Sequence, residues 1–217
     1  MNQLPQDLHV HTTFSRHDGA VTPEQTMKMV AAVAHAQIVG ISDHLESITD
    51  DFDVYAETVR SYGFVVGTEV NGADWVAEAE AVDAQYYVYH CRDREGDYRG
   101  AERLLATGKP LIIAHSLILE TDLRRVPPQC LIEINNRYVW RSDWEILRPF
   151  TTSFSFVIDS DAHQPHWLNQ NVARYVAREL GVSETLLFDE NREHLQFQTA
   201  KAGKKPVSYT HLRAHET

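Results

Sequence analysis

Apolar and polar positions along the chain form two alternating patterns. Short apolar runs of strand length are separated by longer segments in which apolar residues recur every three or four positions. The short runs predict strands at residues 7–11, 37–43, 63–70, 85–90, 110–115, 130–135 and 153–160. The longer segments predict helices near residues 23–36, 52–61, 98–107, 119–125, 141–148 and 167–180. Residues 71–84 match neither pattern and receive no assignment.

Two of these helices carry recognisable end signals. For the first helix, Thr22 is the expected N-cap, Pro23 suits the first helical position, and Gln25 completes a capping box. The last helix is expected to stop at Gly181, because glycine readily adopts the left-handed conformation of a C-cap.

The repeated order of strand and helix predicts parallel strands joined by crossover helices. About seven such strands in one chain of 217 residues predict a single α/β domain, closed or nearly closed into a TIM-like barrel. Functional side chains of such barrels gather at the C-terminal ends of the strands.

Composition limits the location and the partners. No apolar run is long enough to cross a membrane, and the start MNQLPQDLHV lacks the features of a signal peptide, so a cytoplasmic protein without membrane contact is expected. The formal net charge of −11 disfavours an extended nucleic-acid surface, because such surfaces rely on basic side chains. Cys91 and Cys130 are expected to be reduced thiols without a role. The sequence predicts no oligomeric state.

The last residues differ from the rest of the chain. The stretch KAGKKPVSYTHLRAHET loses the apolar periodicity, and VSYTHLRAHET resembles translated adapter sequence from DNA sequencing. We therefore expect one domain over residues 1–199 and a non-native or disordered tail over residues 200–217.

Histidines and two carboxylates recur where the predicted strands end. His9 and His11 are two residues apart, as are Asp161 and His163, so each pair points to one side of its strand. The full set of metal-ligand candidates is His9, His11, His17, His44, Glu69, His90, His115, Asp161 and His163. So many imidazoles at one rim predict a metal site, because burying them without a cation would leave polar groups unpaired. Imidazole and carboxylate ligands without thiolates favour Zn²⁺, Mn²⁺ or Fe.

Nearby polar residues offer further candidates. Asp43 could orient a ligand histidine, but its parity places it on the opposite side of the strand, and a structural contact is an equal alternative. Three arginines lie near strand-end motifs and could bind a phosphate, with a solvated surface role as the alternative: Arg16, Arg92 and Arg137. The remaining histidines outside the tail are expected at the surface: His35, His166 and His194.

The chain resembles the PHP (polymerase and histidinol phosphatase) family in six motifs. They are DLHVHTTFSRH, GISDH, GTEVN, IIAHS, LIEINN and DSDAH, and the resemblance runs from residue 7 to about residue 197. Its trinuclear members imply a distorted seven-stranded (β/α)7 barrel with three divalent metal ions at the C-terminal rim. The implied ligand sets are His9, His11, Glu69 and Asp161 for one ion, Glu69, His90 and His115 for the second, and His17, His44 and His163 for the third.

This resemblance implies hydrolysis of a phosphate ester, either a small phosphate monoester or a nucleotide. Glu69 and Asp161 would hold metal ions around a bridging hydroxide that attacks phosphorus, and Arg137 is a candidate phosphate contact. One alternative is a metallo-amidohydrolase acting on a small amide or lactone, because its barrels also begin with HxH and end with Asp. The terminal DxH and Glu69 on the third strand weigh against it. The other alternative is a noncatalytic PHP module, and the complete ligand set weighs against that.

Overall fold

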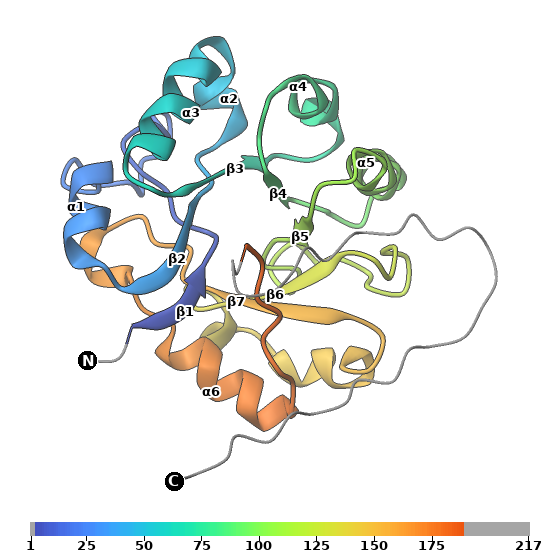
Figure 1. Ribbon diagram of the computed structural model, residues 1–217. Helices are drawn as coiled ribbons and strands as arrows, with labels where there is room; N and C mark the ends of the chain where they lie inside the picture. Colours follow the sequence, from blue (N-terminus) through green and yellow to red (C-terminus); the bar gives the residue numbers. More distant parts are fainter. Residues whose placement is uncertain (1–2, 189–217) are drawn as a thin grey trace, which may run out of the picture.

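The computed structural model describes residues 3–188. Seven strands form one sheet in sequence order, and every neighbouring pair is parallel. The strands are β1 (Leu4–Asp7), β2 (Ala36–Ile41), β3 (Val65–Val70), β4 (Tyr86–Tyr89), β5 (Leu111–Ile113), β6 (Leu131–Asn135) and β7 (Ser155–Asp159). They curve into a ring (Figure 1). The expected seven-stranded α/β barrel is therefore confirmed.

Side chains complete the barrel where β1 approaches β7. The backbone amide of Leu8 donates to Asp159 Oδ1 over 2.6 Å, and the amide of Ser160 donates to Asp7 Oδ1 over 2.9 Å. Carboxylates thus accept bonds that carbonyls would accept in a regular ladder. This substitution leaves the barrel nearly closed and distorted at the seam.

The helices lie outside the ring of strands (Figure 1). They are α1 (Met27–Val33), α2 (Leu45–Ile48), α3 (Phe52–Ser61), α4 (Val76–Ala81), α5 (Glu95–Ala106) and α6 (Asn171–Leu180). Short 3₁₀ helices are η1 (Thr49–Asp51), η2 (Ala73–Trp75), η3 (Val139–Arg141), η4 (Trp144–Phe150) and η5 (Pro165–Trp167). Gly181 caps α6 in the left-handed conformation, with a φ of 70°, which confirms the expected stop.

Two helix predictions were wrong for local reasons. α1 begins four residues later than expected, and Thr26 replaces Thr22 as N-cap. Gln25 forms no capping box, because its side-chain amide donates to the carbonyls of His11 and Ala162. Residues 119–125 form turns, since Glu120 has a φ of 54°, a left-handed conformation that interrupts a helix.

Other boundaries also moved. Residues 141–148 contain the end of η3 and most of η4, with Ser142 and Asp143 between them, instead of one α-helix. β1 ends at Asp7, before the expected end at residue 11, because the amide of Leu8 bonds a side chain and leaves the ladder. The unassigned residues 71–84 contain η2 and α4.

The barrel encloses a small apolar interior built around Tyr86. The Tyr86 ring passes close to two strand backbones, so that a Cβ added at Gly40 or Gly67 would lie 2.2 Å from its atoms. Its hydroxyl donates to the carbonyl of Leu8 over 2.6 Å. A larger apolar cluster fills the space between the sheet and the helices. Glycine at these two strand positions is therefore what admits a tyrosine to the interior.

The segment after α6 returns to the barrel and runs toward the centre of the ring in Figure 1. The amide of Thr185 donates to the carbonyl of Phe156, near the start of β7, over 2.7 Å. Gln6 fixes the segment twice, since its Nε2 donates to the Thr185 carbonyl and its Oε1 accepts the Leu187 amide. Leu187 is buried in the interior cluster. This segment therefore covers the N-terminal end of the barrel.

Within residues 3–188, no helix has both the length and the apolar character needed to cross a membrane. The expected tail at residues 200–217, the last part of the expected domain and His194 lie outside the described residues.

Candidate metal centre

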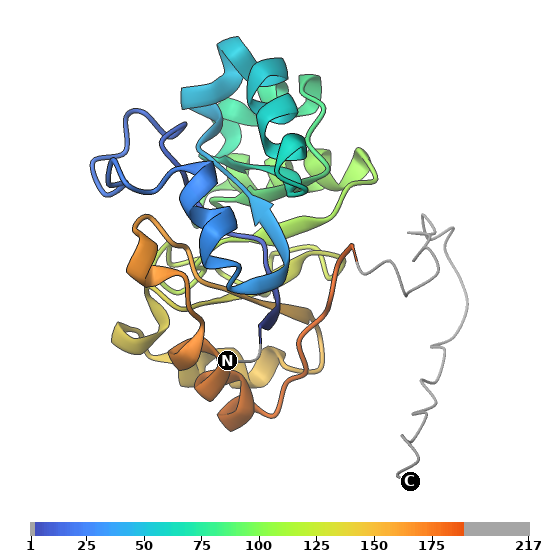
Figure 2. The same ribbon diagram turned by 60° about the vertical axis from the view of Figure 1, so that its left-hand side comes forward.

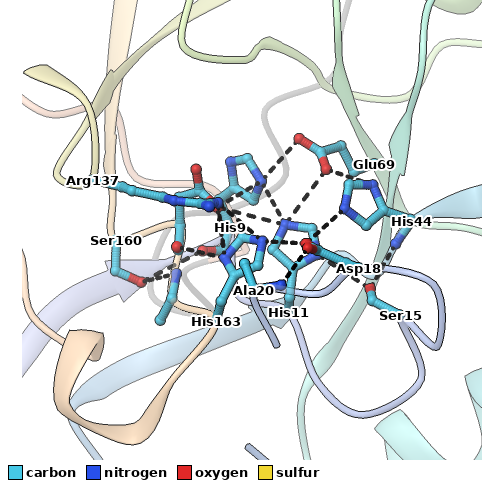
Figure 3. A network of polar contacts seen from close by, with 12 residues as sticks. His9, His11, Ser15, Asp18, Ala20, His44, Glu69, Arg137, Ser160 and His163 are labelled. Carbon is cyan, nitrogen blue, oxygen red and sulfur yellow. Dashed lines mark hydrogen bonds and ion pairs between the residues drawn. The ribbon is translucent and has the colours of Figure 1, made fainter. Parts of the chain in front are cut away.

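Eight of the nine metal-ligand candidates gather at the C-terminal ends of the strands, around a pocket of about 300 Å³. Figure 3 labels His9, His11, His44, Glu69 and His163 among them. A parallel bridge between Val10 and Ala162 sets the two sequence-distant pairs side by side. In Figure 2 the loops that follow β1 and β7 lie next to each other, and the amide of Thr22 donates to the His163 carbonyl over 3.1 Å. The expected meeting of the first and last strands is therefore observed.

The buried carboxylate of Glu69 lies at the centre of the cluster and faces imidazoles on both sides. Its Oε1 lies 2.5 Å from His90 Nε2, 3.2 Å from His9 Nε2 and 3.4 Å from His115 Nε2. Its Oε2 lies 2.9 Å from His44 Nδ1 and 3.5 Å from His11 Nε2. One carboxylate thus lies close to imidazole nitrogens from the ends of four other strands.

Three overlapping groups of ligand atoms have the spacing of metal sites. Within each group the atoms lie within 4.8 Å of one another. The groups are His9, Glu69 and His115; His9, His11 and Asp161; and His11, His44 and His163. Because the groups share His9 and His11, they form one continuous cluster. These buried side chains could hold metal ions.

Hydrogen bonds on the far side of His9 decide which of its nitrogens faces the cluster. Its Nδ1 lies 2.7 Å from Glu133 Oε1, and a carboxylate only accepts, so this nitrogen carries a proton. The Nε2 atom therefore points inward, 3.0 Å from His11 Nε2 and 3.2 Å from Glu69. Glu133 also accepts the amide of His115 over 2.6 Å, which fixes a second strand end.

His11 is oriented through a chain of two residues. Ser15 donates its hydroxyl proton to Asp43 Oδ1 over 2.6 Å, so its oxygen accepts from His11 Nδ1 at 3.3 Å. Burial and the neighbouring His163 lower the pKa of His11 well below its ordinary value, which leaves Nε2 without a proton. Asp43 therefore acts on a candidate ligand through Ser15, despite its opposite strand parity. Burial raises the pKa of Asp43 to about 6.

His90 is also oriented by a chain of two residues. Arg92 donates to Asn71 Oδ1 over 2.7 Å, which identifies that atom as oxygen, so His90 Nδ1 at 3.3 Å is the donor. Burial lowers the pKa of His90, and its bare Nε2 faces Glu69 Oε1. His11 and His90 thus present bare Nε2 atoms to Glu69, and a cation held between these facing acceptors would satisfy them.

Burial and charge move the other pKa values in opposite directions. Burial lowers the pKa of His9, but Glu133, Asp161 and Glu69 outweigh it and hold that pKa well above its ordinary value. Despite burial, the pKa of His44 rises to about 11 beside Glu69. Burial would raise the pKa of Glu69, yet the surrounding histidines hold it well below the usual range. The carboxylates therefore stabilise the protonated forms of His9 and His44. A bound divalent cation would replace that positive charge.

Backbone strain coincides with the cluster. His115 has a φ of 25° and Asp161 a φ of 53°, both in the left-handed region that non-glycine residues rarely adopt. Each of these residues follows the last residue of its strand by two positions. Such strain persists only where the surroundings enforce it, and it recurs at functional sites. Here it turns two candidate ligands inward at the rim.

The loop after β1 contributes a carboxylate that sequence reasoning missed. Asp18 Oδ2 lies 2.7 Å from His163 Nε2 and 3.2 Å from His44 Nε2. His17, the ninth candidate, is exposed on the wall of the pocket, and neither His17 nor His90 belongs to the three ligand groups found within residues 3–188. The third group contains His11 where the resemblance implied His17.

Glu133 was also missed, although it has a recognisable signal. It is a charged residue inside the apolar run LIEI, and only 2% of it is exposed. A carboxylate in a buried strand needs partners, and its register on β6 directs it to the imidazoles of the rim. Asp18 has no comparable signal, because a loop lacks periodicity.

The three candidate arginines have different surroundings. Arg137 lines the pocket, and its Nη1 lies 3.4 Å from Asp161 Oδ1 and 3.0 Å from His163 Nε2. Arg92 supports Asn71, as described above. Arg16 is exposed and lies 3.8 Å from Asp51 at the surface. Of the three candidates, Arg137 is therefore the one that lines the pocket.

One of the histidines expected at the surface was placed wrongly. His35 follows α1, and its side chain is only 5% exposed because its Nε2 bonds Asp7 Oδ2 over 2.8 Å. It supports the seam between β1 and β7 and lies outside the ligand groups. His166 is exposed, as expected.

Comparisons with known proteins assign no family to the chain. No protein-family model matches it, and no curated protein sequence matches it. Among solved structures, it is similar to a truncated form of 3-deoxy-D-arabino-heptulosonate 7-phosphate synthase from Thermotoga maritima, with 12% identity over 83% of this chain and 72% of that one, at a TM-score of 0.44. It is also similar to a designed cube-shaped protein cage, with 16% identity over 83% of this chain and 74% of that one, at a TM-score of 0.38.

Proposed function

We propose that this chain is a PHP-type, metal-dependent phosphoesterase that hydrolyses a small phosphate monoester. The observation that supports this proposal is the convergence of five imidazoles on the buried carboxylate of Glu69, with Asp161 and Arg137 beside them. The donor set suits up to three ions of zinc, manganese or iron. When bound, these ions supply Lewis-acid activation of water and neutralise charge on the phosphate.

The side chains of the cluster have separable roles in this proposal. Glu69 and Asp161 hold the ions and keep their negative charge, since both pKa values lie below the usual range. Glu133, Ser15 with Asp43, and Asn71 with Arg92 orient the imidazoles, so that the ligand atoms need no rearrangement on binding.

Arg137 is the proposed phosphate ligand. Of its guanidinium nitrogens, only Nη1 makes a hydrogen bond within residues 3–188, which leaves Nε and Nη2 available for a phosphate oxygen. Its guanidinium carbon lies 4.8 Å from the Tyr138 ring and 5.3 Å from the Trp167 ring. These faces hold the cation at the pocket while adding no negative charge that would compete with the substrate.

The test combines metal analysis with a substrate screen. Purified protein is loaded with Zn²⁺, Mn²⁺ or Fe²⁺, its metal content is measured by mass spectrometry, and phosphate monoesters, phosphodiesters, cyclic amides and lactones are offered. We expect hydrolysis of monoesters. Arg137→Gln should raise the KM for a monoester roughly ten-fold or more without changing metal content, because a charge-assisted contact is lost.

Arg99→Gln is the matched control, since Arg99 is exposed on α5. It should leave KM and metal content unchanged. Metal-loaded protein that opens amide or lactone rings and leaves phosphate esters intact would support a metallo-amidohydrolase instead. Metal-loaded, folded protein that hydrolyses none of these substrates would support a noncatalytic module.

A further inference from the structure

A second hollow, of about 440 Å³, adjoins the metal pocket and shares Arg137 with it. One side comes from the segment after β6, and the other comes from η5 and the start of α6. Its aromatic and basic lining consists of Arg137, Trp140, Arg141 and Trp167. A volume of this size accepts a small organic group.

Trp140 offers an aromatic face on this hollow. It is 64% exposed, yet its indole Nε1 donates to the carbonyl of Arg137 over 2.8 Å. This bond ties the ring to the residue that also lines the metal pocket. A large aromatic side chain that is exposed and fixed in place presents a surface for stacking at low entropic cost.

Trp167 connects the hollow with the metal centre. Its ring lies 6.1 Å from the His163 ring and 5.3 Å from the guanidinium of Arg137. A phosphate bound by Arg137 therefore lies at the boundary between the two cavities. Whatever is esterified to that phosphate has the hollow beside it.

Arg141 adds a planar cation to the same face. Its guanidinium lies 4.6 Å from the Tyr138 ring and 5.9 Å from the Trp140 ring. Within residues 3–188 it forms no ion pair with a carboxylate. Planar guanidinium groups and indole rings both favour a flat π system as their ligand.

We infer that this hollow binds the leaving group of the phosphate ester, and that the leaving group carries a planar aromatic ring. The inference rests on the proposed phosphoesterase function. In the reaction, water adds to phosphorus and the bond from phosphorus to the ester oxygen breaks. That oxygen takes a proton and stays with the leaving group as an alcohol, and inorganic phosphate is the other product. The aromatic alcohol is the part held in the hollow that Trp140 and Trp167 line.

Binding can be tested without turnover. Benzylphosphonate and ethylphosphonate carry no cleavable ester bond, and each is titrated into metal-loaded protein by calorimetry. We expect benzylphosphonate to bind roughly five-fold more tightly than ethylphosphonate, the size of one aromatic contact. Trp140→Ala should remove this preference while leaving ethylphosphonate binding unchanged, and Trp140→Phe should retain most of it.

Tyr62→Ala is the matched control, because Tyr62 is a 41% exposed aromatic residue at the end of α3. It should keep the wild-type preference. A second measurement compares benzyl phosphate with ethyl phosphate as substrates, whose leaving alcohols are of similar acidity. Trp140→Ala should raise the KM for benzyl phosphate roughly five-fold and leave the KM for ethyl phosphate unchanged.

The outcomes separate this inference from the function on which it rests. Equal affinity for the two phosphonates, no binding of either, or a preference that survives in Trp140→Ala would overturn the aromatic subsite. A preference that depends on Trp140, in a protein that cleaves neither ester, would support the subsite and refute the phosphoesterase. Cleavage of both esters without such a preference would support the phosphoesterase and overturn the aromatic subsite.

Discussion

The two ends of the barrel are built by the same seven strands and hold opposite chemistry. At the N-terminal end, Gln6 pairs its side-chain amide with the backbone of the returning segment, and Leu187 joins the apolar interior around Tyr86. At the C-terminal end, imidazoles are buried against the carboxylate of Glu69, and the bare Nε2 atoms of His11 and His90 face it. The N-terminal end is held by bonds between protein groups, whereas the C-terminal end gathers side chains that could hold metal ions.

This difference indicates which part of the barrel lowers the stability of the fold. Buried Nδ1 of His115 has no hydrogen-bond partner among the described residues, and its backbone lies in the left-handed region. Unpaired buried polar atoms and strained backbone both oppose folding. The close packing at Gly40, Gly67 and Tyr86 contributes stability that offsets this cost. Substitutions at the rim should therefore affect metal and activity, and substitutions in the interior should affect unfolding.

The largest effect on activity is expected from Glu69→Gln. Glu69 faces five imidazoles and belongs to a group that could hold a metal ion, and an amide of the same shape carries no charge to hold a cation. Bound metal should fall by more than one ion per chain, and monoester turnover should fall by roughly 10²–10³-fold or more. Metal analysis and steady-state kinetics measure both quantities.

Glu57→Gln is the matched control, because Glu57 is an exposed glutamate on α3. It should keep wild-type metal content and turnover. If Glu69→Gln also kept full metal occupancy and near-normal turnover, the proposed centre would be wrong.

The next effect in size is expected from Glu133→Gln. Glu133 binds His9 Nδ1 and the amide of His115, but it belongs to none of the ligand groups within residues 3–188. Removing its charge should lower metal affinity by roughly 10–100-fold through loss of ligand orientation. A titration against a competing chelator measures this affinity. Unchanged affinity would show that Glu133 does not orient the ligands.

In the interior, Gly67→Ala should destabilise the fold. The new Cβ would lie 2.2 Å from the Tyr86 ring, which the barrel wall prevents from moving aside. We expect the free energy of unfolding to fall by about 1–3 kcal/mol in denaturant titrations. Gly96→Ala is the control, since its Cβ would meet only Ala73 at 3.4 Å. Equal stability of the two variants would contradict the packing described here.

The barrel could be predicted from the sequence because its signals are periodic. Alternating apolar strands and amphipathic helices indicate crossover connections, and side chains two residues apart at strand ends point to the same side. This reasoning placed His9, His11, Asp161 and His163 at one rim, and the structure brings them together. Apart from this periodicity, the reasoning needed only the order of the strands. The seven strands lie in the sheet in their sequence order.

The remaining features depend on contacts between distant residues. Thr22 and Thr26 are both reasonable N-caps, and the choice is made by Gln25, whose side chain bonds the carbonyls of His11 and Ala162. The pattern of apolar and polar residues does not predict that contact. Asp18 likewise reaches His163 across 145 positions of sequence, through a loop without periodicity.

The smallest effect, and the one that sharpens the description of the rim, concerns Asp18 and His17. The resemblance assigns His17 to the third ion, whereas the structure places Asp18 against His44 and His163. We expect Asp18→Asn to weaken binding of one ion roughly ten-fold, because a carboxylate that fixes two ligand imidazoles is lost. His17→Asn should weaken it less, because His17 is exposed. Metal affinity from chelator competition and KM for a monoester report the difference. If His17→Asn lost an ion while Asp18→Asn kept all of them, the loop after β1 would have to rearrange when metal binds, and the ligand set of the resemblance would be correct.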